Sequence, residues 1–80
     1  MNREAVFADL GEIFLDVLDL DAVDLSDATT ADDIDEWDSL SHIRLVVTIE
    51  RHFKIKFSNA EIEGFNRVGD LVDGILRKLA

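Results

Sequence analysis

The middle of the chain reads WDSLSHIRLVVTIERHF from residue 37 to residue 53. From Ser39 onward apolar residues recur at spacings of three and four, which predicts a helix over residues 39–53. At about 100° per residue, one apolar arc faces the interior. Its members are Leu45, Val46, Ile49 and Phe53. A second arc adjoins it and is either further core or a surface that docks a partner; it consists of Leu40, Ile43 and Val47, with Glu50 on its flank.

The start of this helix carries the tripeptide Asp38-Ser39-Leu40, where an Asp-rich segment gives way to the apolar pattern. Backbone N–H groups at a helix start lack partners, and the helix dipole is positive there. A phosphate esterified to Ser39 would therefore be electrostatically favoured. Asp38 or Ser39 can instead serve as an ordinary helix cap, as such residues usually do. On the tripeptide alone the ordinary cap is the favoured interpretation, because short motifs recur by chance.

The first part of the chain predicts a helix followed by a long loop. The apolar residues of this helix form a single stripe: Val6, Phe7, Leu10, Ile13, Phe14, Val17 and Leu18. Asn2 can cap the helix. Residues 19–37 lose this period and fill with Asp, Ser and Thr, so we expect a loop there. Three apolar residues should anchor the loop onto the core: Leu25, Ile34 and Trp37.

The last part of the chain predicts a short helix and a closing helix. Residues 53–57 alternate apolar and basic side chains, but without a partner strand they are expected to be an extended connection. Ser58 and Glu61 form a capping-box pattern for a short helix bearing Ile62 and Phe65. Asn66 is the expected cap of the last helix, whose stripe comprises Val68, Leu71, Val72, Ile75, Leu76 and Leu79. The sequence therefore predicts one all-α domain over residues 1–80, a small four-helix bundle with three longer helices, a short third helix and a long acidic loop between helices 1 and 2.

Charge is unevenly distributed along the 80 residues. The net charge is −10, and residues 4–43 contain thirteen acidic residues with no Lys or Arg. Such a chain lacks the basic surface that nucleic-acid binding requires, and it favours basic protein partners. There is no Cys, no apolar run of membrane-spanning length, and no signal-peptide pattern at the amino terminus. We therefore expect a cytoplasmic protein that is a monomer.

Metal binding and hydrolysis are both disfavoured. Asp19, Asp21 and Asp24 are not followed by the Gly and terminal Glu of a calcium-binding EF-hand loop, so no dedicated metal site is expected. His42 lies within one helical turn of Ser39, but no Gly-rich nucleophile elbow surrounds the serine. His52 lies ten residues beyond His42, too far for the two rings to bind one ion. The sequence does not predict an enzyme.

The chain resembles a stand-alone acyl carrier protein of the phosphopantetheine-binding family. The resemblance extends over nearly the whole chain and is most specific at Trp37-Asp38-Ser39-Leu40, Leu45-Val46, Ile49-Glu50, Phe53, Val68 and Leu71. It implies that Ser39 receives 4′-phosphopantetheine from coenzyme A through a separate phosphopantetheinyl transferase, with Asp38 and Leu40 beside the attachment point. The arm would then carry an acyl or aminoacyl group as a thioester. A thioester carrier without its own thiol must import one.

Several positions depart from the pattern of fatty-acid-synthesis carriers. Glu36-Trp37 stands where a Gly usually precedes the motif, and Ser41 stands where an acid usually follows it. Arg44 and Arg51 occupy positions that are often acidic in those carriers. The resemblance thus implies a contact surface for loading, modifying and transferring enzymes with altered charge, made of Ile43, Arg44, Val47, Glu50 and Arg51.

That altered charge favours a specialised lipid, polyketide or surface-polysaccharide pathway. Two alternatives remain open from the sequence. The chain is either a peptidyl or aminoacyl carrier, or a helical protein-interaction module that keeps the fold without a prosthetic group. The intact Asp38-Ser39-Leu40 tripeptide argues against an unmodified module.

Overall fold

The computed structural model describes residues 2–80; Met1, part of the amino-terminal segment considered above for a signal peptide, lies outside the described residues. Its helices are α1 (Arg3–Val17), the short 3-10 helix η1 (Ala31–Asp33), α2 (Ser39–Phe53), α3 (Asn59–Glu63) and α4 (Val68–Leu79). Within residues 2–80 there is no strand, and a single isolated antiparallel bridge joins Thr30 to Arg67. The predicted all-α bundle with a short third helix is confirmed, and residues 39–53 are helical as expected.

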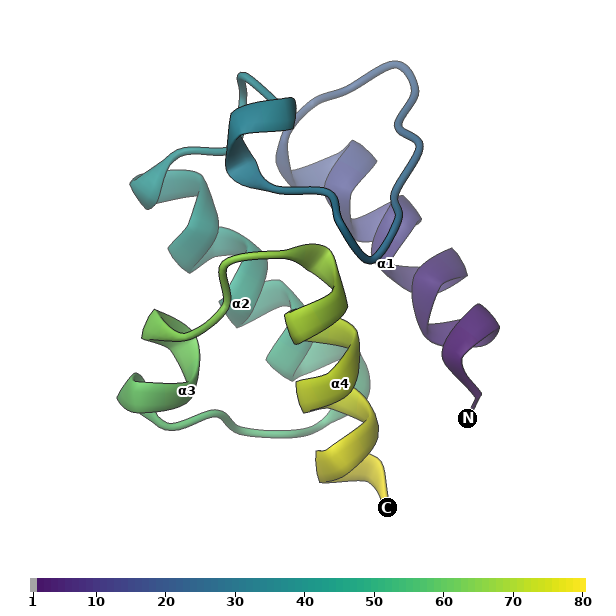
Figure 1. Cartoon of the computed structure of the whole chain (residues 1–80), viewed down its shortest axis with the longest axis vertical. Helices are drawn as coiled ribbons and strands as arrows, with labels where there is room; N and C mark the ends of the chain where they lie inside the picture. Colours follow the sequence, from purple (N-terminus) through teal and green to yellow (C-terminus); the bar gives the residue numbers. More distant parts are fainter. Residues whose placement is uncertain (1) are drawn as a thin grey trace.

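Helix α1 packs against both α2 and α4, and α3 lies below α2 in the view of Figure 1. The segment between α1 and α2, which includes η1, covers one end of the bundle, and both termini lie toward the other end (Figure 1). The molecule measures 31 × 25 × 22 Å along its principal axes. The start of α2 thus lies at the looped end of the bundle, where a long segment can hold it in place.

Helix α1 begins and ends with recognisable caps. The Asn2 side chain accepts a hydrogen bond from the Ala5 N–H at 2.8 Å, which confirms the predicted cap. At the other end Asp19 adopts a left-handed conformation with φ of 55°, and the Leu20 N–H donates to the Leu15 carbonyl at 2.9 Å. This is the Schellman arrangement that commonly ends helices.

The core gathers apolar side chains from every long helix and from the loop. It includes the predicted inner arc of α2, Leu45, Val46, Ile49 and Phe53, and the α4 residues Val68, Leu71, Val72 and Ile75. The prediction is wrong for one residue of the stripe on α4. Leu79 keeps 38% of its surface exposed, because it lies in the last turn of α4 and no element covers it. Loop residues Ile34 and Trp37 are buried and Leu25 is partly buried, as expected of anchors.

The acidic loop is tied to α4 by backbone contacts. The Val68 N–H donates to the Thr29 carbonyl at 2.8 Å, and the Gly69 N–H donates to the Asp27 carbonyl at 3.1 Å. A Cβ on Gly69 would lie 2.9 Å from that same carbonyl oxygen, so only glycine permits this approach. The Arg3 guanidinium also pairs with the Asp27 and Asp73 carboxylates. The loop therefore has defined attachments despite its length.

The connections around α3 follow the sequence in part. Glu50 accepts a hydrogen bond from the Phe57 N–H at 2.8 Å, which holds the extended connection against α2. The capping box of Ser58 and Glu61 is present, as predicted.

The expected cap of the last helix is wrong. Arg67, not Asn66, is the N-cap of α4. The reason is that Asp70 reaches back from the first turn and accepts hydrogen bonds from the backbone N–H groups of both Asn66 and Arg67.

Candidate functional site at the start of α2

Ser39 is the first residue of α2 and is exposed to solvent. Asp38 caps the helix, because its carboxylate accepts the Ser41 N–H at 2.9 Å. The Ser41 hydroxyl lies 2.9 Å from the same carboxylate oxygen and 2.8 Å from the Glu36 carbonyl. These contacts with Ser41 lower the pKa of Asp38 from its ordinary value. Within residues 2–80 the Ser39 hydroxyl has no hydrogen-bond partner, so Asp38 is the cap and Ser39 is left available.

A chain of hydrogen bonds runs beside Ser39. The Trp37 Nε1–H donates to His42 Nδ1 at 3.2 Å, and His42 Nε2 lies 3.3 Å from the Ile62 carbonyl. An indole nitrogen can only donate, so His42 Nδ1 must be the acceptor and Nε2 carries the proton. The chain connects the loop before α2, the first turn of α2 and the end of α3.

An open groove of about 440 Å³ lies next to Ser39. It is lined by Ala31, Trp37, Asp38, Ser39, His42, Ile43, Ile62, Glu63, Phe65 and Asn66. Apolar and aromatic side chains thus contribute much of its wall, and the polar groups include the Ser39 hydroxyl and the carboxylates of Asp38 and Glu63. A flexible group attached to Ser39 could rest there.

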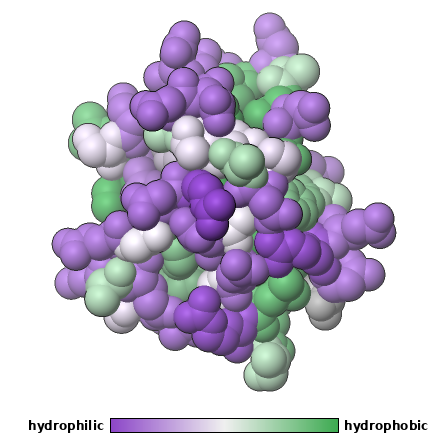
Figure 2. Space-filling model, in the orientation of Figure 1, coloured by the Kyte–Doolittle hydropathy of each residue, from purple (hydrophilic) through white to green (hydrophobic). Residues whose placement is uncertain are grey.

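The second apolar arc of α2 faces solvent. Leu40, Ile43 and Val47 are 78%, 54% and 40% exposed. Hydrophobic surface shows at the left edge of Figure 2, on the side where Figure 1 places α2. Of the two interpretations of this arc, the structure excludes burial in the core. Exposed large apolar side chains side by side on one helix are typical of a contact surface.

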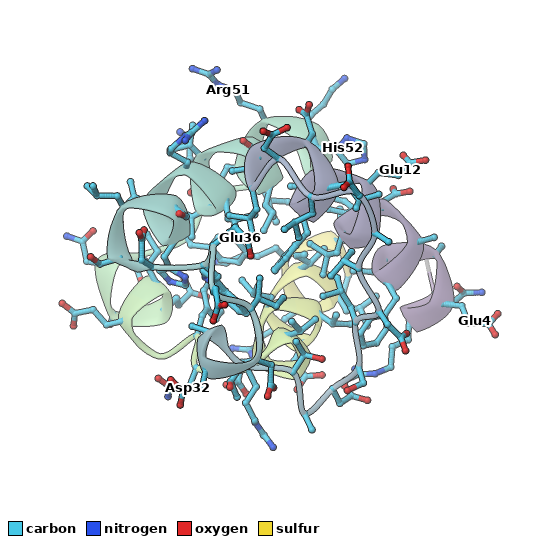
Figure 3. All side chains as sticks on the ribbon, turned by 90° about the horizontal axis from the view of Figure 1, so that it is seen from above. Glu4, Glu12, Asp32, Glu36, Arg51 and His52 are labelled. Carbon is cyan, nitrogen blue, oxygen red and sulfur yellow. The ribbon has the colours of Figure 1, made fainter. Side chains whose placement is uncertain are left out.

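The charged residues expected beside this arc divide into two kinds. Arg44 and Arg51 are exposed, and Figure 3 shows Arg51 projecting away from the body of the molecule. Glu50 instead is half-buried, and its carboxylate accepts a hydrogen bond from the Phe57 N–H. Near the end of α2 a second open hollow of about 480 Å³ is lined by Val47, Glu50, Arg51, Lys54, Ile55 and Lys56. Ile43 therefore lies with Ser39, whereas Val47, Glu50 and Arg51 lie at a separate hollow.

Other chemistries find no support around Ser39. Both ring nitrogens of His42 are used by Trp37 and Ile62, so the imidazole does not act as a base for the serine. His52 Nε2 pairs with Asp9 at 3.1 Å and joins α2 to α1. Among residues 2–80 no cluster of three or more His, Asp or Glu side chains is arranged to hold a metal ion. No helix in the same part of the chain is long and apolar enough to cross a membrane.

Sequence reasoning missed part of the site. Trp37 was expected as a core anchor and as part of the stretch most specific to the resemblance, and His42 as a helix residue within one turn of Ser39. Neither was expected to line a groove, yet they do so together. Ile62 lies in α3, whereas Phe65 lies in the connection after it, so the prediction of a short helix bearing Phe65 is wrong. Both side chains meet Trp37 and His42 only in the fold. The spacing of Trp37 and His42 gives no signal, because Trp37 precedes the helix and its neighbour in space is set by the loop.

Comparison with known proteins agrees with this geometry. Residues 8–75 match the family described as "Phosphopantetheine attachment site". An acyl carrier protein from Thermotoga maritima is 33% identical over 98% of this chain and 96% of its own length. One from Streptococcus thermophilus is 40% identical over 85% of this chain and 88% of its own length.

Solved structures give the same answer. The solution structure of a holo acyl carrier protein from Geobacter metallireducens has a TM-score of 0.85 and 47% identity, covering 90% of this chain and 83% of that protein. The crystal structure of an acyl carrier protein from Thermotoga maritima has a TM-score of 0.87 and 28% identity, covering 99% of this chain and 92% of the other. With an exposed serine at the start of α2 inside the matched region, this chain belongs to the family of acyl carrier proteins with a phosphopantetheine attachment site.

Proposed function

We propose that Ser39 is the residue that bears the 4′-phosphopantetheine of this carrier, and that the whole chain acts as one monomeric carrier domain in the cytoplasm. The observation that carries the proposal is the contrast between two neighbouring serines. The Ser41 hydroxyl is engaged by Asp38 and Glu36, whereas the Ser39 hydroxyl is exposed and free of partners within residues 2–80. As an acyl carrier protein, the chain is a carrier and not an enzyme.

The attachment is a phosphoryl-group transfer with a simple balance. Ser39 Oγ attacks the phosphorus next to the pantetheine of coenzyme A, and the pyrophosphate bond breaks. Ser39 loses its proton, a phosphodiester forms, and adenosine 3′,5′-bisphosphate leaves. The transferase supplies the catalytic groups.

The residues around Ser39 fit such a group. The N-terminus of α2 offers unpaired backbone N–H groups and the positive end of the dipole to the phosphodiester. The groove lined by Trp37, Ile43 and Phe65 offers apolar surface to the arm. When bound, the arm supplies the thiol on which acyl groups are carried, which a chain without Cys cannot provide itself.

The test is intact mass after incubation with coenzyme A and a broad-specificity phosphopantetheinyl transferase. Wild type should gain one phosphopantetheine, and Ser39→Ala should gain none while remaining folded by circular dichroism. Ser41→Ala is the matched control, because it removes the neighbouring hydroxyl and should still be modified. Modification of Ser39→Ala, or its loss in folded Ser41→Ala, contradicts the proposal.

We infer further that the exposed face of α2 is the contact surface for the enzymes that load, modify and unload the carrier. Leu40, Ile43 and Val47 provide apolar contact area, and Arg44 and Arg51 set the charge of the face. The exposed charged side chains that line the hollow with Glu50 are all basic: Arg51, Lys54 and Lys56. Such a face suits partners with acidic patches and disfavours strongly basic ones.

This charge supports a dedicated role in a specialised lipid, polyketide or surface-polysaccharide pathway. Housekeeping fatty-acid-synthesis enzymes should turn over the acylated wild type poorly, and Arg44→Glu/Arg51→Glu should improve turnover. Arg77→Glu on α4 is the control. It changes the net charge by the same amount as either substitution on α2 but leaves the α2 face unaltered. Efficient turnover of wild type by those enzymes contradicts the specialised role.

A further inference from the structure

Trp37 and His42 are joined by a hydrogen bond and separate the groove beside Ser39 from the core; we call this pair the partition. Trp37 is only 4% exposed, and its ring lies edge-on to Phe14 with centroids 5.1 Å apart. Its indole N–H is held by His42, which is bonded in turn to the Ile62 carbonyl. The partition therefore extends from the loop, across α2, to α3 and is joined to the core on its inner side.

The opposite wall of the groove is also filled. Phe65 lies edge-on to Phe57, with centroids 4.9 Å apart. Both rings press on α4 at Gly74, where an added Cβ would lie 3.1 Å from Phe65 and 3.3 Å from Phe57. The adjoining α4 residues Leu71 and Ile75 are fully buried. The space between α3 and α4 is thus occupied to contact distance.

We propose that the chain Trp37–His42–Ile62 closes the floor of the groove, so that an acyl group carried on Ser39 lies in the open groove and does not enter the helical bundle. Trp37 and His42 are then positioning residues that determine which cargo the carrier accommodates. This inference rests on the proposed attachment at Ser39.

The hydrogen bonds explain why the floor stays closed. An acyl chain passing into the bundle must displace the Trp37 ring or the His42 ring. Either displacement leaves the Trp37 N–H without its acceptor in a place where water has little access. A hydrocarbon chain brings no acceptor of its own. Surface binding avoids this loss.

The test compares wild type carrying acetyl, hexanoyl or decanoyl groups, each transferred from the matching acyl-coenzyme A and verified by intact mass. A cargo buried in the folded state stabilises it, and the effect grows with buried length. We expect thermal midpoints that agree within about 1 °C across the three cargoes. A midpoint that rises stepwise with chain length overturns the inference.

Variants identify the residues responsible. His42→Ala removes both hydrogen bonds, so decanoyl should then raise the midpoint by about 4 °C or more relative to acetyl. Trp37→Phe keeps a ring against Phe14 but removes the donor, and it should give the same dependence if His42→Ala is too unstable to measure. His52→Ala is the control on the same helix and should behave as wild type.

The outcomes separate the two proposals. No added mass on wild type refutes attachment at Ser39 and the carrier assignment of that residue. Added mass with length-dependent midpoints in wild type refutes only the closed floor. Midpoints that stay independent of length in both His42→Ala and Trp37→Phe show that these residues do not form the barrier, which also refutes the inference.

Discussion

Asp38 accepts two hydrogen bonds from Ser41, one from the backbone N–H and one from the hydroxyl, both at 2.9 Å. The first closes the N-terminus of α2, and the second holds the side chain that lies two residues after Ser39. Because these bonds favour the ionised carboxylate, they lower the pKa of Asp38. The cap is therefore coupled to pH.

A pH series should expose this coupling. A group whose pKa is lowered on folding contributes stability above its unfolded pKa, about 3.9 for aspartate, and loses it as pH falls through the folded value. Asp38→Asn keeps a capping oxygen but does not titrate. The difference in free energy of unfolding between wild type and Asp38→Asn should be constant above about pH 5 and shrink below about pH 4. Urea unfolding at each pH measures it, and a difference that does not change with pH contradicts the coupling.

Two glycines should respond to alanine in opposite directions. Gly11 lies within α1 with no atom within 4 Å of an added Cβ, so Gly11→Ala should raise the free energy of unfolding by about 0.5–1 kcal/mol. At Gly69 the new Cβ would lie 2.9 Å from the Asp27 carbonyl oxygen, so Gly69→Ala should lower the free energy of unfolding by about 1–3 kcal/mol. Chemical denaturation of both variants tests the pair. A stabilised Gly69→Ala is incompatible with the close approach of the loop to α4.

The left-handed residue after α1 offers a stabilising substitution. Asp19 has φ of 55° and carries a negative charge at the negative end of the α1 dipole. Asp19→Gly removes both penalties and should raise the free energy of unfolding by about 0.5–1 kcal/mol. Asp21→Gly is the control, because it also removes one charge of the loop at a residue without positive φ. If the two variants shift the unfolding midpoint equally, the gain comes from charge and not from backbone conformation.

The acidic charge should make stability depend on salt. With a net charge of −10, self-repulsion weakens the folded state, and added NaCl screens it. The thermal midpoint should rise between about 0.01 M and about 1 M NaCl. Arg3→Ala removes the cation shared by Asp27 and Asp73, so its midpoint should fall most at low salt. Lys56→Ala, outside the helices, should show a smaller effect, and a wild-type melt insensitive to salt refutes the argument.

Much of the fold follows from local patterns in the sequence. The inner arc of α2 was predictable because its spacing of three and four leaves no other face for Leu45 and Ile49. Caps such as Asn2 and Ser58 were predictable because they act on N–H groups three residues away. Local rules failed where neighbours compete, as when Asp70 reached back and made Arg67 the cap in place of Asn66.

In the site, too, features set by neighbouring residues in the sequence were predictable, and features set by distant residues were not. Asp38 and Ser39 could be placed at a helix start because both the motif and the cap are contiguous in sequence. The partition behind them could not be foreseen, since the Ile62 carbonyl that holds His42 lies twenty residues away. The hydrogen bond between Glu50 and the Phe57 N–H was likewise unforeseen, because it depends on the path of the connection after α2.

The uneven distribution of charge also affects how the molecule is oriented as it diffuses toward a partner. Residues 4–43 hold thirteen acidic side chains, whereas Arg51 near the end of α2 projects from the side of the molecule opposite Asp32 (Figure 3). A body with such electrical polarity experiences a torque in the field of a charged enzyme. During diffusion it would rotate so that its acidic part faces basic surfaces and its basic flank faces acidic ones, which raises the share of encounters that have a productive orientation.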